Sequence, residues 1–251
     1  VHTNFLHRNF SGSQVGAMDR ARSLSLAATV EVAPTDYGYT YAGIREISED
    51  EGNYVRSYHF IAPFYQLRPN QLGKAQGKAS GHIWVPIDDE TTLVWNFSYR
   101  FDGEPLSEAE RAQTGSGNEF GKDIVVENGF RSKASAENDY FIDRAVQKTQ
   151  TFSGIPGTNT QDRAVQDTMG PICDRTKEHL GTTDRAIIMA RKILMEALKT
   201  VDDGGTPPGL DPSVYSLRPI EKVLPSGTAW QGALAGELYH GVPYSTEYVP
   251  A

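Results

Sequence analysis

The sequence predicts an α+β fold in which one antiparallel sheet carries helices on one of its faces. Segments with strand-like alternation follow one another through the first hundred residues with short connections, which is typical of an antiparallel meander. The second half changes to helical spacing and includes one long amphipathic segment. A chain of 251 residues with 38% hydrophobic residues can bury one substantial core, so we expect residues 1–251 to form a single domain.

Five segments in the first half are rich in β-branched and aromatic residues and alternate in polarity, which favours strands. They are residues 27–33, 37–47, 54–67, 81–87 and 91–101. Turn-forming residues at 34–36 and 50–53 separate the first three segments. Pro63 cannot donate a ladder hydrogen bond, so it predicts a bulge or an edge position within the third segment. The acidic residues 88–90 join the last two segments in a hairpin.

Helical segments follow in the second half, interrupted by a Gly-, Asn- and Ser-rich stretch at 114–138 that predicts a long surface loop. Segments with helical spacing are residues 107–113, 140–147, 160–168 and 183–201. The last of these has a clear apolar stripe, and Thr182 or Thr183 is expected to cap it. The Gly- and Pro-rich run at 203–208 ends this helix, and we expect no regular element in the remaining tail.

Charge and cysteine content exclude several classes of function. The net charge of −8 disfavours a surface that follows nucleic-acid phosphates, and no apolar run is long enough to span a membrane. Cys173 is the single cysteine, so the chain can build neither an internal disulfide nor a Cys-rich zinc or iron–sulfur site. Any metal must therefore be held by histidines and carboxylates. Nothing suggests secretion, and we expect a cytoplasmic protein.

Two histidines near the N-terminus, His2 and His7, are the first candidate metal ligands. Residues 1–10 read as the tail of a helix, on which positions five apart point about 140° away from each other. The two rings can converge on one metal only if that helix is distorted, for example by a π-bulge. A zinc protease would need His-x3-His with a Glu after the first histidine, and this segment has neither feature. From the spacing alone, two ordinary surface or core histidines are the more common explanation.

Two imidazoles and one carboxylate would suit a facial triad on Fe(II). A third ligand has to come from elsewhere, and the helical stretch 159–167 carries two carboxylates, Asp162 and Asp167. Both precede the Met-Gly-Pro-Ile segment at 169–172, which looks packed. Composition does not choose between the two carboxylates.

The run from Gln161 to Asp184, which begins Gln-Asp-Arg-Ala-Val-Gln-Asp-Thr-Met-Gly-Pro-Ile, closely resembles the end of the catalytic domain in Rieske non-haem iron oxygenases. It is most similar to the phthalate-dioxygenase-type branch of their alpha subunits. The segment from His2 to His7 resembles that family's two-histidine iron motif, and the Asp-Gly-Gly-Thr-Pro-Pro run at 203–208 is similar as well. The resemblance implies a helix-grip (START/Bet v1-like) fold, with Asp162 as the third iron ligand and Asp167 on a helix face.

By this resemblance the chain is the iron-binding catalytic domain of an oxygenase that uses O2 to hydroxylate or O-demethylate a small aromatic compound, with an aromatic acid as the preferred candidate. Mono- and dihydroxylation both stay open. Electrons would come from a Rieske [2Fe-2S] cluster on an upstream domain absent from this chain. A separate reductase with NAD(P)H and flavin would supply that cluster. Family members are commonly trimers, so we expect a homotrimer, with no nucleic-acid or membrane partner.

The alternative function is a non-catalytic module of the same fold that binds hydrophobic ligands, in which the histidines would be incidental. Arg45 and Arg56 lie on expected strands and are secondary candidates for contacting a substrate carboxylate, because a cation facing a cavity needs a partner. A solvent-facing arginine is the more common explanation for each. Other polar and aromatic residues are expected to have structural roles: His59, His82, His179, His240, Asp174, Tyr37, Tyr39 and Tyr41.

Overall fold

The computed structural model describes residues 5–10, 21, 24, 25, 27–69, 77–111, 124, 125 and 129–240. The chain forms two compact units. Unit 1 consists of Val1–Gln14, Asp89–Thr91 and Pro105–Glu178, and unit 2 consists of Val15–Asp88, Thr92–Glu104 and His179–Ala251. The expectation that residues 1–251 form a single domain stays a prediction. Over the described ranges, no helix is long and apolar enough to cross a membrane.

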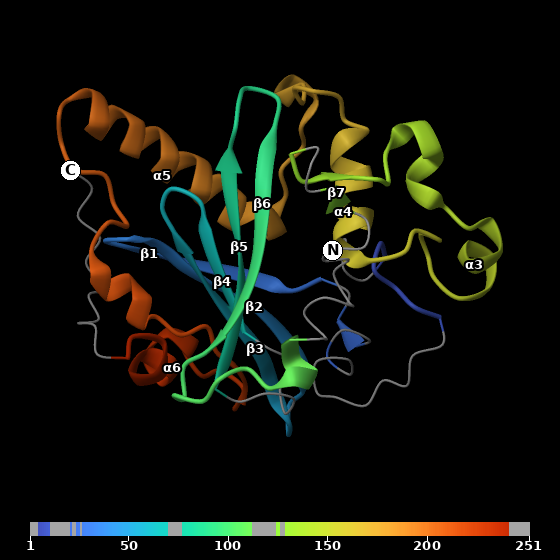
Figure 1. Cartoon of the computed structure of the whole chain (residues 1–251). Helices are drawn as coiled ribbons and strands as arrows, with labels where there is room; N and C mark the ends of the chain where they lie inside the picture. The colour runs from blue at the N-terminus through green and yellow to red at the C-terminus, as the bar shows by residue number, and fades with distance from the viewer. Residues whose placement is uncertain are drawn as a thin grey trace. The chain divides into compact units, whose positions relative to one another are not determined.

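Unit 2 is built on one antiparallel sheet (Figure 1). Its strands are β1 (Thr29–Thr35), β2 (Gly38–Ser48), β3 (Gly52–Ile61), β4 (Tyr65–Pro69), β5 (Lys78–Pro86), β6 (Thr92–Arg100) and β9 (Glu221–Leu224). Strands β1 to β6 lie side by side in chain order, and β9 pairs with β3. Its helical elements are η5 (Thr182–Asp184), α5 (Arg185–Asp202), η6 (Pro212–Ser216) and α6 (Trp230–Leu238). The predicted meander and the α+β helix-grip class are confirmed.

The segment 54–67 was expected to be one strand, and that prediction is wrong. Strand β3 ends at Ile61, and β4 begins at Tyr65 and pairs back with it. Pro63 lies in the turn between them. The strand ladder needs no N–H donor at this position, so proline is tolerated there. The described part of the first hundred positions therefore holds six strands rather than five.

The two faces of β2 pack against different helices. Tyr39 belongs to a buried cluster with Ile193 of α5, so this face of the sheet grips the long helix. Ala42 points to the other face, because side chains alternate along a strand, and it lies in the main core with Leu234 of α6. Helix α5 agrees closely with the expected helix at 183–201. Its N-cap is Asp184, which follows the short η5 turn, rather than Thr182 or Thr183.

The tail after residue 206 was expected to lack regular elements, and this is also wrong. Strand β9 joins the sheet, with Glu221 opposite Arg56 of β3. Helix α6 contributes Trp230, Leu234 and Leu238, each at most 1% exposed, to the main core. The sequence of α6 is apolar or small on nearly every side, so no amphipathic stripe marked it as a helix.

Unit 1 has its own small core, and its regular elements are mainly short helices joined by loops. Its elements are β7 (Ile124–Val125), β8 (Arg131–Ser132), η3 (Ala136–Phe141), α3 (Arg144–Thr149), α4 (Thr158–Asp167) and η4 (Arg175–Lys177). Ala134, Tyr140, Ile155 and Ala164 form the buried cluster. The helix predicted at 160–168 is confirmed as α4. The one predicted at 140–147 is displaced to α3, where Asp143 caps the first turn by accepting from Ala145 and Val146.

Two expected segments are only partly described. The helix expected at 107–113 is present at residues 108–111, and residues 112 and 113 lie outside the described ranges. Within the expected loop at 114–138, strands β7 and β8 form a two-stranded ladder. The connecting segment expected at 11–24 lies almost wholly outside the described residues.

Candidate metal centre

The described part of the N-terminal segment, residues 5–10, was expected to end a helix and instead forms a turn followed by an extended bridge. Asn9 pairs antiparallel with Thr151, and backbone hydrogen bonds of 2.9 and 2.7 Å close the bridge on either side. This long-range pairing fixes the backbone next to His7 within unit 1. His2 lies outside the described residues.

Helix α4 carries the candidate carboxylate. Its N-cap, Gly157, has φ of +79°, a conformation that favours glycine, and this residue lets the chain turn sharply into the helix. Thr160, Gln161 and Ala164 are buried on the face that packs into the core of unit 1. Asp162 follows Gln161 directly and is partly exposed beside this face.

The structure brings His7 and Asp162 together. The Nε2 atom of His7 lies 3.2 Å from Oδ1 of Asp162, with the side chains 15% and 35% exposed, respectively. The pair is therefore partly shielded on the imidazole side and more accessible on the carboxylate side. The other carboxylate of this helix, Asp167, accepts a 3.2 Å hydrogen bond from the hydroxyl of Tyr140.

The opposite edge of the His7 ring contacts a residue that the sequence had not singled out. Nδ1 of His7 lies 2.7 Å from Oε1 of Gln161, and Nε2 of Gln161 donates to the carbonyl oxygen of Ile155 at 2.9 Å. Successive residues of α4 thus contact the two nitrogens of one imidazole. The only sequence signal for this role was the position of Gln161 immediately before the candidate aspartate.

The donor set fits a divalent cation. Imidazole nitrogen and carboxylate oxygen together suit Fe(II). Two such donors, each about 2.1 Å from an octahedral cation and at right angles to each other, would lie about 3 Å apart, close to the observed separation. Across the described residues, no group of three or more histidine, cysteine or acidic side chains is arranged to hold a metal. The pair supplies two candidate ligands, and the expected partner, His2, lies outside those residues.

Arg56 has a carboxylate partner within unit 2. Its Nε atom lies 3.5 Å from Oε2 of Glu221, and its terminal NH2 donates to the carbonyl of Pro69 at 2.9 Å. Arg56 was a secondary candidate for contacting a substrate carboxylate, and Glu221 supplies a carboxylate partner within the chain. Arg45 lies on β2 opposite Tyr54 of β3 and is partly buried. A role for either arginine in substrate binding stays a prediction.

The residues expected to be structural behave mainly as expected. His59 is fully buried and bonded through both ring nitrogens, to the Tyr37 hydroxyl at 2.7 Å and to the Arg218 carbonyl at 3.0 Å. Asp174 caps η4 by accepting from the Thr176 backbone, and the hydrogen bond from the Thr176 hydroxyl is the main cause that lowers its pKa. The others lie as follows: His82 stacks on Trp84, His179 and His240 are exposed, Tyr39 is buried and stacks on Phe60, and Tyr41 stacks on Tyr58.

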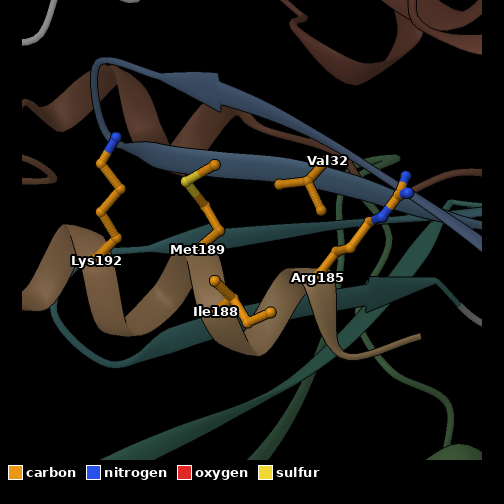
Figure 2. A pocket seen from close by; sticks show the side chains of 5 residues that line it. All are labelled: Val32, Arg185, Ile188, Met189 and Lys192. Carbon is orange, nitrogen blue, oxygen red and sulfur yellow. The ribbon is translucent and has the colours of Figure 1, made fainter. Parts of the chain in front are cut away.

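A separate hollow of about 310 Å³ lies within unit 2, between β1 and the first turns of α5. Figure 2 shows Val32 of the strand facing Arg185, Ile188, Met189 and Lys192 of the helix. The hollow thus lies between the sheet and the long helix of unit 2. Its lining contains no acid or histidine, so it offers no metal ligands.

Comparisons with known proteins agree with the resemblance drawn from the sequence. The model of a family described as LigXa C-terminal domain like matches residues 11–245. The chain is 32% identical over 253 aligned residues to the 3-chlorobenzoate-3,4-dioxygenase oxygenase subunit of Comamonas testosteroni, covering 92% of this chain and 56% of that protein. It is 30% identical over 260 residues to the phthalate 4,5-dioxygenase oxygenase subunit of Pseudomonas putida, covering 99% of this chain and 55% of that protein. The chain therefore spans about half the length of these two relatives.

Proposed function

Because this chain belongs to the LigXa C-terminal domain-like family, we propose that it is the iron-binding catalytic part of an O2-dependent oxygenase acting on a small aromatic compound. The observation that carries the proposal is the 3.2 Å approach of His7 Nε2 to Asp162 Oδ1. Family membership supports an oxidoreductase, and the pair supplies two donors of the kind such a reaction needs.

The proposed ligand set is His2, His7 and Asp162, a triad of two histidines and one carboxylate on Fe(II). When bound, the iron supplies the redox chemistry that activates O2, and three protein ligands leave coordination positions open. The chain's own residues hold the metal. Because they include a single carboxylate, they neutralise only half of the charge of a divalent cation. The greater exposure of Asp162 leaves an approach for small molecules beside that ligand.

The proposed substrate is an aromatic acid. Both relatives are named for aromatic carboxylates, 3-chlorobenzoate and phthalate, and for dioxygenation. Ring hydroxylation is accordingly the leading reaction. Monohydroxylation and O-demethylation need the same ligand triad, so they remain within the proposal. Arg45 and Arg56 are the proposed candidates for a carboxylate contact, and Arg56 already pairs with Glu221 within the chain.

The electrons are proposed to come from outside this sequence. A [2Fe-2S] cluster needs several protein ligands, and Cys173 is the single cysteine in the 251 residues. We therefore propose a Rieske cluster on another polypeptide segment, reduced by a separate NAD(P)H- and flavin-dependent reductase. A homotrimer in the cytoplasm is part of the same proposal, since adjacent subunits could bring a cluster to this iron.

The test is anaerobic Fe(II) loading followed by measurement of iron per chain. Wild type should retain about one iron, whereas His2→Ala, His7→Ala and Asp162→Ala should each lose most of it, because a lost ligand weakens the site strongly. Asp167→Asn is the matched control, since it changes the other carboxylate of α4, which bonds to Tyr140. That variant should load iron like wild type.

The competing function, a non-catalytic module for hydrophobic ligands, makes the opposite prediction. Such a module would show no stoichiometric iron and would be indifferent to all three alanine variants. Iron binding that survives His7→Ala and Asp162→Ala unchanged would also refute the proposed site. Either result would favour the hollow between β1 and α5 as the ligand-binding site instead.

A further inference from the structure

Gln161 is a buried side chain whose two amide ends have different partners. The residue is 8% exposed, and it lies in the first turns of α4, where its backbone N–H bonds to the Gly157 carbonyl. One end of its amide contacts the Ile155 carbonyl at 2.9 Å, and the other contacts Nδ1 of His7 at 2.7 Å. Since a buried amide without partners would be costly, both contacts constrain how the side chain is oriented.

The hydrogen-bond network assigns the proton on His7. The backbone carbonyl of Ile155 can only accept, so the amide nitrogen of Gln161 must face it. The amide oxygen then faces His7, and because that oxygen can only accept, Nδ1 of His7 must carry the hydrogen. The remaining ring nitrogen, Nε2, is the one that lies 3.2 Å from the Asp162 carboxylate.

We infer that Gln161 is a positioning residue that holds His7 with Nδ1 protonated and Nε2 directed at the metal beside Asp162. This inference rests on the proposed function, because it assigns the metal-facing nitrogen of a proposed iron ligand. A ligand histidine needs one ring nitrogen free of hydrogen, and a hydrogen bond from the other nitrogen fixes both tautomer and ring orientation. Gln161 thereby serves the site without touching the metal itself.

The support for Gln161 is itself fixed by local structure. The backbone N–H of Ile155 donates to the Ser153 hydroxyl at 3.2 Å, and the Ile155 side chain is part of the buried cluster of unit 1. The carbonyl that orients the amide is therefore held by a packed loop. Gln161 and Asp162 are neighbours on one helix, so the same element sets both contacts to the His7 ring.

A purely structural role is the alternative, in which Gln161 only ties α4 to the Ile155 loop. Two variants together separate the roles: in Gln161→Met, methionine has similar volume and length but loses both the contact to His7 and the contact to the Ile155 carbonyl. Gln161→Glu retains an acceptor toward His7. Gln166→Leu is the matched control, since Gln166 is an exposed glutamine on the same helix.

The readouts are metal affinity and ring protonation rather than turnover. Fe(II) binding is measured anaerobically by competition with a chelator, and Co(II) absorption reports the ligand geometry. Gln161→Met should bind Fe(II) about 10- to 100-fold more weakly with an altered Co(II) spectrum, as is typical when the hydrogen-bond partner of a ligand histidine is lost. Gln161→Glu should restore most of the affinity, and Gln166→Leu should match wild type. Equal affinity and an identical spectrum in Gln161→Met would overturn the inference.

The nitrogen-15 spectrum of the histidine rings, recorded on wild type loaded with Zn(II), provides a test that needs no variant. It should show hydrogen on Nδ1 of His7 and metal on Nε2. Metal on Nδ1 would overturn the inference even if Gln161→Met failed to fold. If wild type binds no metal at all, the proposed function fails instead, so the two failures are distinguishable.

Discussion

Lowering the pH from 7.5 to 5 should destabilise this protein through one buried histidine of the core. The His59 side chain is fully buried, its Nδ1 accepts a hydrogen bond from the Tyr37 hydroxyl, and its Nε2 donates to the Arg218 carbonyl. Burial lowers the pKa of His59 to about 4, and the bond to the Arg218 carbonyl offsets only part of that effect. The native core therefore holds a neutral imidazole well into the acidic range.

The size of the effect follows from the difference between native and unfolded proton binding. In the unfolded chain the His59 pKa is 6.5, so between pH 6.5 and pH 4 the unfolded state binds a proton that the native state does not. The stabilising contribution is fully present above pH 6.5 and is lost progressively as the pH falls toward 4. At pH 5 the loss relative to pH 7.5 is about 2 kcal/mol, since one pKa unit corresponds to about 1.4 kcal/mol.

The assay is urea denaturation of wild type and His59→Gln at pH 7.5 and pH 5. Carboxylates titrate equally in both proteins, so the extra loss in wild type isolates His59. The glutamine variant should be less stable at pH 7.5, yet it should lose about 2 kcal/mol less on acidification. Equal losses in the two proteins would refute the reasoning. If the variant does not fold, the ring of His59 can be titrated by NMR in wild type, and a midpoint above pH 6 would refute it as well.

Two further predictions concern packing in unit 2. Glu221→Ala removes a buried carboxylate and leaves its partner Arg56, which is partly buried, so it should lower the free energy of unfolding by roughly 3–5 kcal/mol. Glu237→Ala, at an exposed pair with a lysine, should cost less than about 1 kcal/mol. Comparable urea-denaturation losses for both would contradict this assignment. Leu234→Ala in α6 should cost roughly 2–5 kcal/mol, and Leu198→Ala, at a residue 61% exposed on α5, should cost under about 1 kcal/mol. A small loss at Leu234 would mean that α6 is not packed as described.

The fold was predictable where local pattern and tertiary packing agree. Strands β1, β2, β5 and β6 and helix α5 carry clear periodicity, and all five lie where the sequence placed them, within a few residues. Helix α6 was missed because its apolar residues are not confined to one stripe, and β9 was missed because a four-residue strand has too little alternation to recognise. Both elements are stabilised by partners far away in sequence, as β9 is by β3. A local sequence pattern does not indicate such partners.

The candidate site shows the same division between local and long-range information. Sequence composition left Asp162 and Asp167 equivalent, but five positions along an α-helix rotate a side chain by about 500°, so the two carboxylates point about 140° apart. Only one of them can face His7, and the other bonds to Tyr140 instead.

Which carboxylate faces His7 depends on the antiparallel bridge between Asn9 and Thr151, because this bridge sets where the His7 backbone lies within unit 1. The position of α4 relative to His7 also explains why Gln161 contacts the same ring. One position before Asp162 on the helix, it is rotated by about 100°, enough for the two side chains to reach opposite nitrogens of one ring. A single helix register thus selects the candidate ligand and its hydrogen-bonding support together, so neither contact could shift to a neighbouring residue without loss of the other.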